Sequence, residues 1–406
     1  MKDYIITLLS FRKFISMQLL SFDEDFLRQK GAILTAAEIS GQPKLWNEIV
    51  HLFTSASGEI KDFLKIAYTE VDNIILTGAG TSAFIGLSLQ GVFFRNACIV
   101  TRAIATTDIV SHPTDYFNNS QTYLIISFAR SGNSPESCAA LELADKFSKK
   151  CFHLIITCTE SGALAQYNSS NPSYVFVLPE AANDKSLAMT GSYSGMLLTG
   201  LLTAYIHYPE IVKEQTGLLI QAAENILTGQ LSALQAIAKK DFKRAVFLGS
   251  GNLFGTATEA ALKLQELTDG KIICKEDSYL GLRHGPKAVI DKNTLVIYFF
   301  SNDNYVEQYE HDLVNDMKSG NNALFVLSVS EQFKALDDID AQVNFGNGSD
   351  HIAEDFLPVC AILPGQLLGF YKSLALGLKP DEPSVNGSIS RVVQGVNIYP
   401  LEKATI

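Results

Sequence analysis

The sequence predicts an α/β fold that contains two doubly wound parallel sheets in tandem. A β-branched strand, a Gly-rich turn and a helix of small residues follow one another twice, in Asn73–Gly91 and again in Ala245–Lys263. The glycines that open the two turns, Gly78 and Gly249, lie about one α/β domain length apart. A chain of 406 residues has room for two core-forming domains and peripheral elements. An internal repeat of this length indicates two similar halves.

The remaining strand and helix patterns support the same fold class. Apolar runs with the length of buried strands occur at five further places: Tyr123–Ser127, His153–Thr157, Tyr174–Leu178, Leu295–Phe300 and Ala323–Leu327. Helical patterns such as Ser137–Lys149 and Tyr305–Lys318 separate them. Alternating strands and helices are typical of crossover connections between parallel strands.

Helical segments surround the two halves. Residues 17–72 form a helical lead-in with Trp46 on an apolar face, and Gly195–Ile206 has the length of a buried helix. Residues 362–406 predict a helix followed by a tail rich in Pro, Gly, Asn and Ser.

These patterns divide the chain into four parts. We expect a helical N-terminal segment (1–50), a first domain (51–215), a second domain (216–375) and a C-terminal tail (376–406). Residues 1–16 are either a misread start upstream of Met17 or a real helical extension.

The composition indicates a globular protein whose main partner is not a polyanion. Charged residues make up 18% and hydrophobic residues 47% of the chain, and the formal net charge is −11. Nucleic acids and anionic membranes bind clustered Lys and Arg, so this acidic balance argues against both. The apolar run Met1–Phe11 ends at Arg12 and is too short to span a membrane. We therefore expect a soluble cytoplasmic protein.

The six cysteines show no spacing typical of a metal site or a disulfide framework. Reduced and mostly buried thiols are the expected state. We expect neither a metal nor a redox cofactor.

The first Gly-rich turn, Gly78-Ala79-Gly80-Thr81-Ser82, follows a strand and begins a helix. Backbone N–H groups at a helix N-terminus favour an anion. A dinucleotide is a weak interpretation, since Phe84 stands where a third glycine is needed and Thr101-Arg102-Ala103 lacks the acidic residue that binds ribose. A tight turn with an ordinary Ser or Thr cap fits this motif as well as an anion site does.

The second turn predicts a phosphate site more sharply. It follows the strand Tyr123–Ser127 and ends at Pro135-Glu136, a common helix start. Ser131 and Ser134 can donate to phosphate oxygens, and Arg130 adds a positive charge. A serine cap alone explains neither Arg130 nor Ser131. Ser82 of the first turn joins them as a candidate, because adjacent strand ends meet at one edge of a sheet.

A third loop, Asp184–Ser192, precedes the buried helix. Thr190 and Ser192 could complete the ligand shell, although a capped buried helix has the same pattern. Thr190 stays a candidate phosphate ligand.

The second half lacks the serine motif, because Tyr298–Asp303 stands where it should be. Its first helix instead carries Glu259, Lys263 and Glu266 on one face. Ordinary surface ion pairing is the preferred interpretation for Glu259. Lys263 and Glu266 are candidate catalytic residues, because their helix is rich in Ala and Leu and packs close to its Gly-rich turn.

His284 is the candidate proton carrier among the seven histidines. It stands between Arg283 and Gly285-Pro286, a setting that presents a side chain rather than burying it. Histidine exchanges protons near neutral pH.

Together these motifs resemble the sugar isomerase (SIS) family, whose paired domains form the isomerase half of glucosamine-6-phosphate synthase. The similar segments are Gly80-Thr81-Ser82, Arg130–Ser134, Ala261–Glu266 and Arg283–Pro286. Within the family, four segments look like the bacterial galactosamine-6-phosphate deaminase/isomerase group: Thr35–Ile39, Gly41–Trp46, Ser186–Thr190 and Arg391–Gly395.

The resemblance implies an enzyme that converts D-galactosamine 6-phosphate and water into D-tagatose 6-phosphate and ammonium. Ser82, Ser131 and Ser134 would anchor the phosphate, His284 would open the ring, and Glu266 would carry a proton between C2 and C1. Lys263 would stabilise developing oxyanion charge or keep Glu266 ionised. The family builds its site with a histidine from a neighbouring subunit, so a homodimer or higher homo-oligomer is expected.

Two departures from the synthase bear on the reaction. No glutaminase segment with a nucleophilic cysteine is present, so deamination is the sensible direction. The synthase also has a tail lysine that binds the open-chain sugar, whereas Asp381–Gly395 contains no lysine and offers Arg391 instead.

Two alternatives remain at this point. A tagatose-6-phosphate ketose/aldose isomerase would use the same residues without releasing an amine. A non-catalytic sugar-phosphate sensor would need the phosphate loops but not Lys263, Glu266 and His284, and the sequence shows no DNA-recognition helix.

Overall fold

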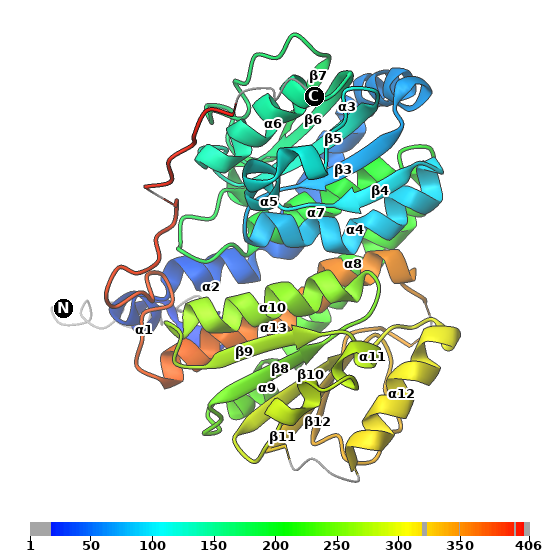
Figure 1. Ribbon diagram of the computed structural model, residues 1–406. Helices are drawn as coiled ribbons and strands as arrows, with labels where there is room; N and C mark the ends of the chain where they lie inside the picture. Colours follow the sequence, from blue (N-terminus) through cyan, green and yellow to red (C-terminus); the bar gives the residue numbers. More distant parts are fainter. Residues whose placement is uncertain (1–17, 319–322, 349, 394, 402–406) are drawn as a thin grey trace, which may run out of the picture.

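The computed structural model describes residues 18–401 apart from 319–322, 349 and 394, and it contains two parallel five-stranded sheets (Figure 1). The first sheet has the order β4 (Val100–Ala103), β3 (Asn73–Thr77), β5 (Thr122–Ala129), β6 (Lys150–Thr157) and β7 (Ser173–Val177). The second has the order β9 (Ile273–Asp277), β8 (Arg244–Leu248), β10 (Thr294–Phe299), β11 (Phe325–Ser330) and β12 (Ala341–Asn344). Both sheets thus place their strands in the same order relative to the chain, which confirms two doubly wound halves.

Helices surround and join the sheets. The α-helices are α1 (Glu24–Lys30), α2 (Ile33–Ser40), α3 (Gln42–Glu70), α4 (Thr81–Ala97), α5 (Thr106–Ser111), α6 (Pro135–Phe147), α7 (Gly191–Ala204), α8 (Pro209–Gly229), α9 (Leu231–Ala238), α10 (Leu253–Leu267), α11 (Tyr279–Leu282), α12 (Asn304–Lys318) and α13 (Leu357–Ala375). A short antiparallel hairpin of β1 (Gln18–Leu19) and β2 (Phe22–Asp23) precedes them. Every residue of α7 is buried, as its apolar sequence predicts.

The apolar runs correctly predicted strands, including the edge strand β7, whereas the edge strands β4, β9 and β12 were missed. The run predicted at Ala323–Leu327 forms β11 slightly later, at Phe325–Ser330. Strands β4, β9 and β12 are each the edge strand of a sheet and are largely half-exposed. Such strands need no continuous apolar run, so the sequence carries little signal for them.

Two of the expected domain boundaries fall inside helices. Positions 50 and 215 lie within α3 and α8, and each helix continues across the expected division. Helix α13 ends at Ala375, directly before the segment expected to be the tail. The alternatives for residues 1–16 concern a segment outside the described residues.

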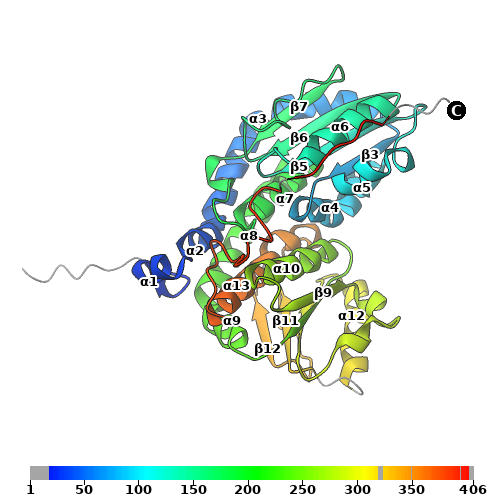
Figure 2. The ribbon, with the colours of Figure 1, turned by 60° about the vertical axis from the view of Figure 1, so that its left-hand side comes forward.

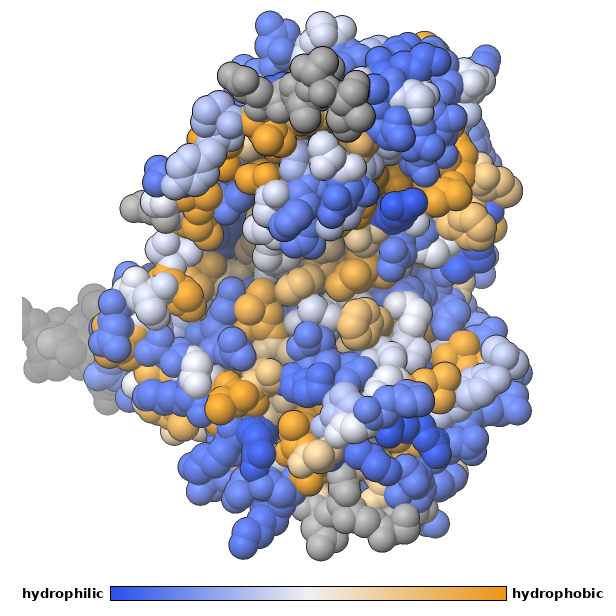
Figure 3. Space-filling view, viewed as in Figure 1, coloured by the Kyte–Doolittle hydropathy of each residue, from blue (hydrophilic) through white to orange (hydrophobic). Residues whose placement is uncertain are grey.

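Helices α4, α10 and α13 lie between the two sheets (Figure 1). A Cβ atom on Gly255 of α10 would lie 2.3 Å from Ser88 Oγ of α4, and one on Gly365 of α13 would lie 2.6 Å from the Cβ of Ala260. Glycine therefore lets α10 approach both neighbours closely. One hydrophobic core runs through both halves, and apolar side chains also gather in a band across the middle of the face in Figure 3. This packing brings α10 of the second half against the first half.

No helix within the described ranges is long and apolar enough to cross a membrane. The six cysteines are free, and Cys151, Cys158 and Cys360 are buried.

Glu310 of α12 is a buried acid at the carboxyl end of β10. Its Oε2 accepts a hydrogen bond from the Ser301 N–H at 3.0 Å, and burial raises its pKa from 4.5 to about 8. Between these values the folded protein holds a proton that the unfolded chain releases. The contribution of Glu310 to the free energy of unfolding is therefore full below about pH 4.5 and is lost as the pH rises through about 8.

We expect Glu310→Gln to melt at the wild-type temperature near pH 5 and above it near pH 9, because the amide carries no charge to bury. Thermal melts followed by circular dichroism measure this. Glu224→Gln on the exposed face of α8 is the control and should show no such trend. A difference from wild type that stays constant with pH would contradict the prediction.

Candidate active site

A cavity of about 590 Å³ opens at the carboxyl ends of β3 and β5. Strands β3 and β5 are neighbours in the sheet, but the chain continues from β3 to β4 on one side and from β5 to β6 on the other. Doubly wound folds bind ligands at such a switch point in the strand order. The lining comes from the turns after these strands, from α10, and from the tail at residues 387–393. Figure 2 shows the tail, in red, crossing from the second half to the first.

The three predicted serines, Ser82, Ser131 and Ser134, line one side of this cavity together with Ser137. Ser82 lies in the first turn of α4, and Ser134 directly precedes α6, so both lie beside the N–H groups of a helix N-terminus. Gly132 has φ +64°, a conformation that favours glycine, and lets the chain turn between Ser131 and Ser134. Hydroxyls and helix N-termini together favour a phosphate at this position.

Arg130 supplies a buried positive charge in the cavity wall. Only 7% of the residue is exposed. Its guanidinium donates to the carbonyl oxygens of Leu187, at 3.2 Å, and of Arg391. Burial lowers its pKa, and the neighbouring Asp184 opposes that change. The charge contributes a favourable field for an anion, although its hydrogen bonds go to the protein.

The opposite wall carries a glutamate and a lysine from α10. Glu266 and Lys263 both line the cavity, and Lys263 Nζ donates to Glu266 Oε2. The same ammonium group donates to Thr81 Oγ1 at 3.1 Å and lies 3.4 Å from Glu259 Oε1. Lys263 therefore connects the second half to the first Gly-rich turn. The Glu266 side chain is 23% exposed and can reach a ligand.

Burial and charge set the protonation of this group. Burial alone would lower the pKa of Lys263, but Glu259 and Glu266 raise it above its ordinary value, so Lys263 is a cation. Burial raises the pKa of Glu259 to about 8, against the opposing effect of Lys263. One cation thus lies between the accessible Glu266 and the fully buried Glu259.

The expectation that Glu259 forms an ordinary surface ion pair is wrong. Its side chain has no exposed area, because α10 is covered by α4 and α13 on the side that carries it. Its position four residues before Lys263 and between Ala257 and Ala260 is the signal that could have revealed this burial.

The structure does not bring two of the predicted residues into the cavity. Thr190 is fully buried, and its backbone N–H donates to Asp184 Oδ2 at 2.7 Å and its hydroxyl to Asp184 Oδ1 at 3.3 Å. The Asp184 carboxylate thus caps α7, and the polar groups of Thr190 bond to it instead of facing a ligand. His284 is exposed in the turn after α11 and does not line the cavity of its own chain. Arg391 does line the cavity, but its guanidinium bonds to Asn183 Oδ1 and to the Asp184 carbonyl.

Several lining residues escaped sequence reasoning. Thr81, Leu187 and Met189 line the cavity, as do Ser388 and Ser390 of the tail. Thr81 belongs to a motif that was identified, but the tail serines have no local pattern. Only the folded path of the tail brings them to the site.

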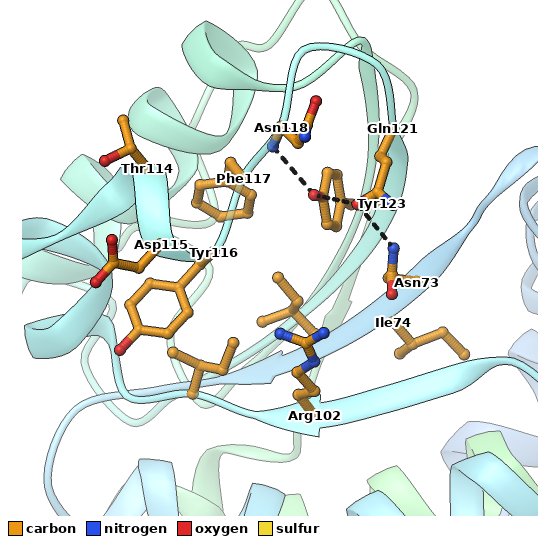
Figure 4. Close-up of a pocket in the computed structure, with 12 residues that line it drawn as sticks. Asn73, Ile74, Arg102, Thr114, Asp115, Tyr116, Phe117, Asn118, Gln121 and Tyr123 are labelled. Atoms are coloured by element: carbon orange, nitrogen blue, oxygen red, sulfur yellow. Dashed lines mark hydrogen bonds between the residues drawn. The ribbon is translucent and has the colours of Figure 1, made fainter.

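A second pocket lies at the other end of the first sheet (Figure 4). It measures about 200 Å³ and is lined by residues that include Asn73, Arg102 and Tyr123. Asn73 begins β3 and Tyr123 is near the start of β5, so this pocket is at the amino ends of the strands that carry the candidate site at their carboxyl ends. It contains none of the Gly- and Ser-rich turns.

Asp145, Cys151 and His153 lie close enough to hold a metal ion. The Asp145 carboxylate already pairs with His153 Nε2 at 2.7 Å and accepts hydrogen bonds from the Tyr167 and Ser169 hydroxyls. The hydrogen bonds of Asp145 with His153, Tyr167 and Ser169 account for this cluster without a metal ion.

The profile of the SIS domain matches residues 67–206, which include the turns after β3 and β5 that line the cavity. The chain belongs to the SIS domain family. It is 40% identical to the D-galactosamine-6-phosphate deaminase AgaS of Shewanella sp. (strain ANA-3) over 381 residues, which are 93% of this chain and 94% of that protein. It is 38% identical to the protein of the same name in Escherichia coli O157:H7, over 90% of this chain and 95% of that protein.

Solved structures with similar sequences have the same fold. A crystal structure from Clostridium novyi superposes with a TM-score of 0.92 and 41% identity, covering 95% of this chain and 100% of that one. The structure of tagatose-6-phosphate ketose/aldose isomerase from Escherichia coli gives a TM-score of 0.79 and 33% identity over 91% of this chain and 97% of that one.

Proposed function

We propose that this protein is a deaminating aldose–ketose isomerase that converts D-galactosamine 6-phosphate and water into D-tagatose 6-phosphate and ammonium. The main support is one cavity that joins the serine loops of the first half to Glu266 and Lys263 of the second. Relatives that match almost the whole chain carry the name of this deaminase.

The phosphate end of the substrate positions the reacting end. Ser82, Ser131 and Ser134, with the nearby N–H groups, bind the phosphate, which places C1 and C2 near the other wall. His284 of the partner subunit opens the ring by moving the ring-oxygen and anomeric protons. Its exposed position outside its own cavity fits this role, so the proposal requires at least a dimer, which sedimentation measurements can test.

Glu266 then carries out the proton transfer. It removes the C2 proton to give an enolamine and returns a proton to C1, which yields an imine at C2. Water adds to the imine, and the C–N bond breaks as ammonium leaves the ketose. Lys263 donates a hydrogen bond to Glu266 and stabilises the developing negative charge on the C1 oxygen.

Ammonium release tests the proposal directly. The purified protein is incubated separately with galactosamine 6-phosphate, glucosamine 6-phosphate, their N-acetylated forms and galactose 6-phosphate, and ammonium and ketose phosphate are measured together. Equal amounts of both products from galactosamine 6-phosphate are expected. Ketose phosphate from galactose 6-phosphate without any ammonium from the amino sugar would favour the plain isomerase, an alternative supported by the name of a structural neighbour. Binding without any product would favour a sensor.

We expect Ser131→Ala to raise the KM for the sugar phosphate about 10- to 100-fold while kcat falls less, because a hydrogen bond to a charged group contributes about 1.5–3 kcal/mol. Steady-state kinetics measure this split. Ser55→Ala on the exposed face of α3 is the control and should leave both constants unchanged. An unchanged KM for Ser131→Ala would contradict the assignment of the phosphate end.

A further inference from the structure

Glu38 of α2 holds a loop that forms part of the cavity wall. Its Oε1 accepts hydrogen bonds from the backbone N–H groups of Lys185, at 2.5 Å, and Ser186, at 3.1 Å. Its Oε2 accepts a third bond from the Ser186 hydroxyl. Glu38 lies about 150 residues before this loop, so the contact is purely tertiary. One carboxylate thus fixes two consecutive residues of the 183–190 loop.

The same helix also holds the C-terminal tail. Asp381 Oδ1 accepts hydrogen bonds from the Thr35 N–H, at 2.8 Å, and from the Thr35 hydroxyl, at 2.9 Å. The Asp381 carbonyl accepts a bond from the Leu187 N–H at 3.0 Å. Thr35 has no exposed area. Helix α2 therefore anchors the loop and the tail within one turn of each other.

The loop and the tail that α2 holds both contact the candidate active site. Leu187 lines the cavity, and its carbonyl accepts from Arg130. Arg130 also donates to the Arg391 carbonyl, and Arg391 donates back to the Asp184 carbonyl at 2.9 Å. The hydrogen bonds form a closed ring through the loop, the phosphate turn and the tail.

A carboxylate in this place has an energetic cost. Burial and the neighbouring Asp184 raise the pKa of Glu38 to about 7, and the hydrogen bonds from residues 185 and 186 act in the opposite direction. Glu38 lines neither of the two pockets described above. Its three bonds to the loop are the contacts that offset its burial.

We propose that Glu38 is a positioning residue of the candidate active site, which with Thr35 holds the 183–190 loop and the 381–393 tail closed over the sugar-phosphate cavity. The proposal rests on the proposed function for the identity of the ligand. Helix α2 of the N-terminal segment then contributes to substrate binding as well as covering the core.

Glu38→Ala tests this role. We expect the KM for galactosamine 6-phosphate to rise at least 10-fold and kcat to change much less, since loop and tail must be ordered each time substrate binds. Backbone amides of residues 185–187 should exchange with solvent at least 10-fold faster in hydrogen-exchange measurements. Glu48→Ala is the matched control, because it removes a half-exposed glutamate of α3 whose partner is the exposed Lys44. The control should match the wild type in both measurements.

Two further variants separate positioning from general stability. Glu38→Gln keeps one oxygen for the two N–H groups and should recover most of the wild-type KM. Ser186→Ala removes one bond from the loop side, so its effect on KM should largely disappear in the Glu38→Ala background. A loss of melting temperature in Glu38→Ala with an unchanged KM and unchanged loop exchange would overturn the proposal.

The outcome is distinguishable from a failure of the proposed function. If the wild type releases no ammonium, the deaminase assignment fails, and affinity for tagatose 6-phosphate by calorimetry replaces KM as the readout. Hydrogen exchange of residues 185–187 needs no substrate at all. Equal exchange in wild type and Glu38→Ala therefore refutes positioning whatever the reaction is.

Discussion

Glu266→Gln is expected to reduce kcat for ammonium release by about 10²- to 10⁴-fold while the affinity for tagatose 6-phosphate stays within about twofold of wild type. The amide has almost the shape of the carboxylate and can still accept a hydrogen bond from Lys263, so the cavity keeps its form. It cannot take up the C2 proton. Binding depends on the serine loops of the other wall, which the substitution does not touch.

Isotope exchange makes this test specific to the proton transfer. In deuterated water the wild type should incorporate deuterium at C1 of the product, and Glu266→Gln should not. Glu224→Gln on α8 changes an exposed carboxylate of the same type and should behave as wild type. Turnover by Glu266→Gln close to the wild-type rate would show that another group moves the proton.

The fold could be predicted because its signals are local and repeated. In each half a buried strand ends in glycines and a helix of small residues follows, and the structure has β3 with α4 and β8 with α10 at these places. Physical chemistry allows few other structures for this order of elements. The edge strands carry weaker signals, since β4 and β9 need apolar side chains on only part of their surface.

The candidate site was predictable only where a single turn contains it. The serines after β5 and the pair Lys263 and Glu266 on one helix face are recognisable from spacing alone. The burial of Glu259 and the path of the tail depend on how helices from different halves pack. Thr190 was predicted to bind the ligand, because a hydroxyl near a helix start suits a ligand and a cap equally well. In the structure this hydroxyl donates to Asp184 instead.

Lys263→Met is expected to be the most damaging substitution for both stability and activity. It removes the cation that faces Glu266 and the fully buried Glu259. Loss of one partner from a buried ion pair costs about 3–5 kcal/mol of unfolding free energy. We expect a large fall in melting temperature above about pH 8, where Glu259 is ionised, and a loss of at least about 100-fold in kcat/KM, since Glu266 also loses its hydrogen-bond donor. Lys65→Met on the exposed face of α3 is the control.

The pH dependence of this variant follows from Glu259. Its pKa is raised by burial to about 8 even with Lys263 present, so without the cation the carboxyl keeps its proton to still higher pH. The folded state then binds a proton that the unfolded chain releases, and its stability falls as the pH rises. The difference in melting temperature between wild type and Lys263→Met should therefore be small near pH 5 and grow toward pH 9.

A double variant separates the two roles of the lysine. Glu259→Gln/Lys263→Met leaves no buried carboxylate without a partner, so it should recover most of the melting temperature and lose the pH trend. Its kcat/KM should stay as low as that of Lys263→Met, because Glu266 still lacks the ammonium group that donates a hydrogen bond to it. Recovery of activity together with stability would mean that Lys263 only neutralises a buried charge. Recovery of stability alone would place Lys263 in the acid–base chemistry of the site.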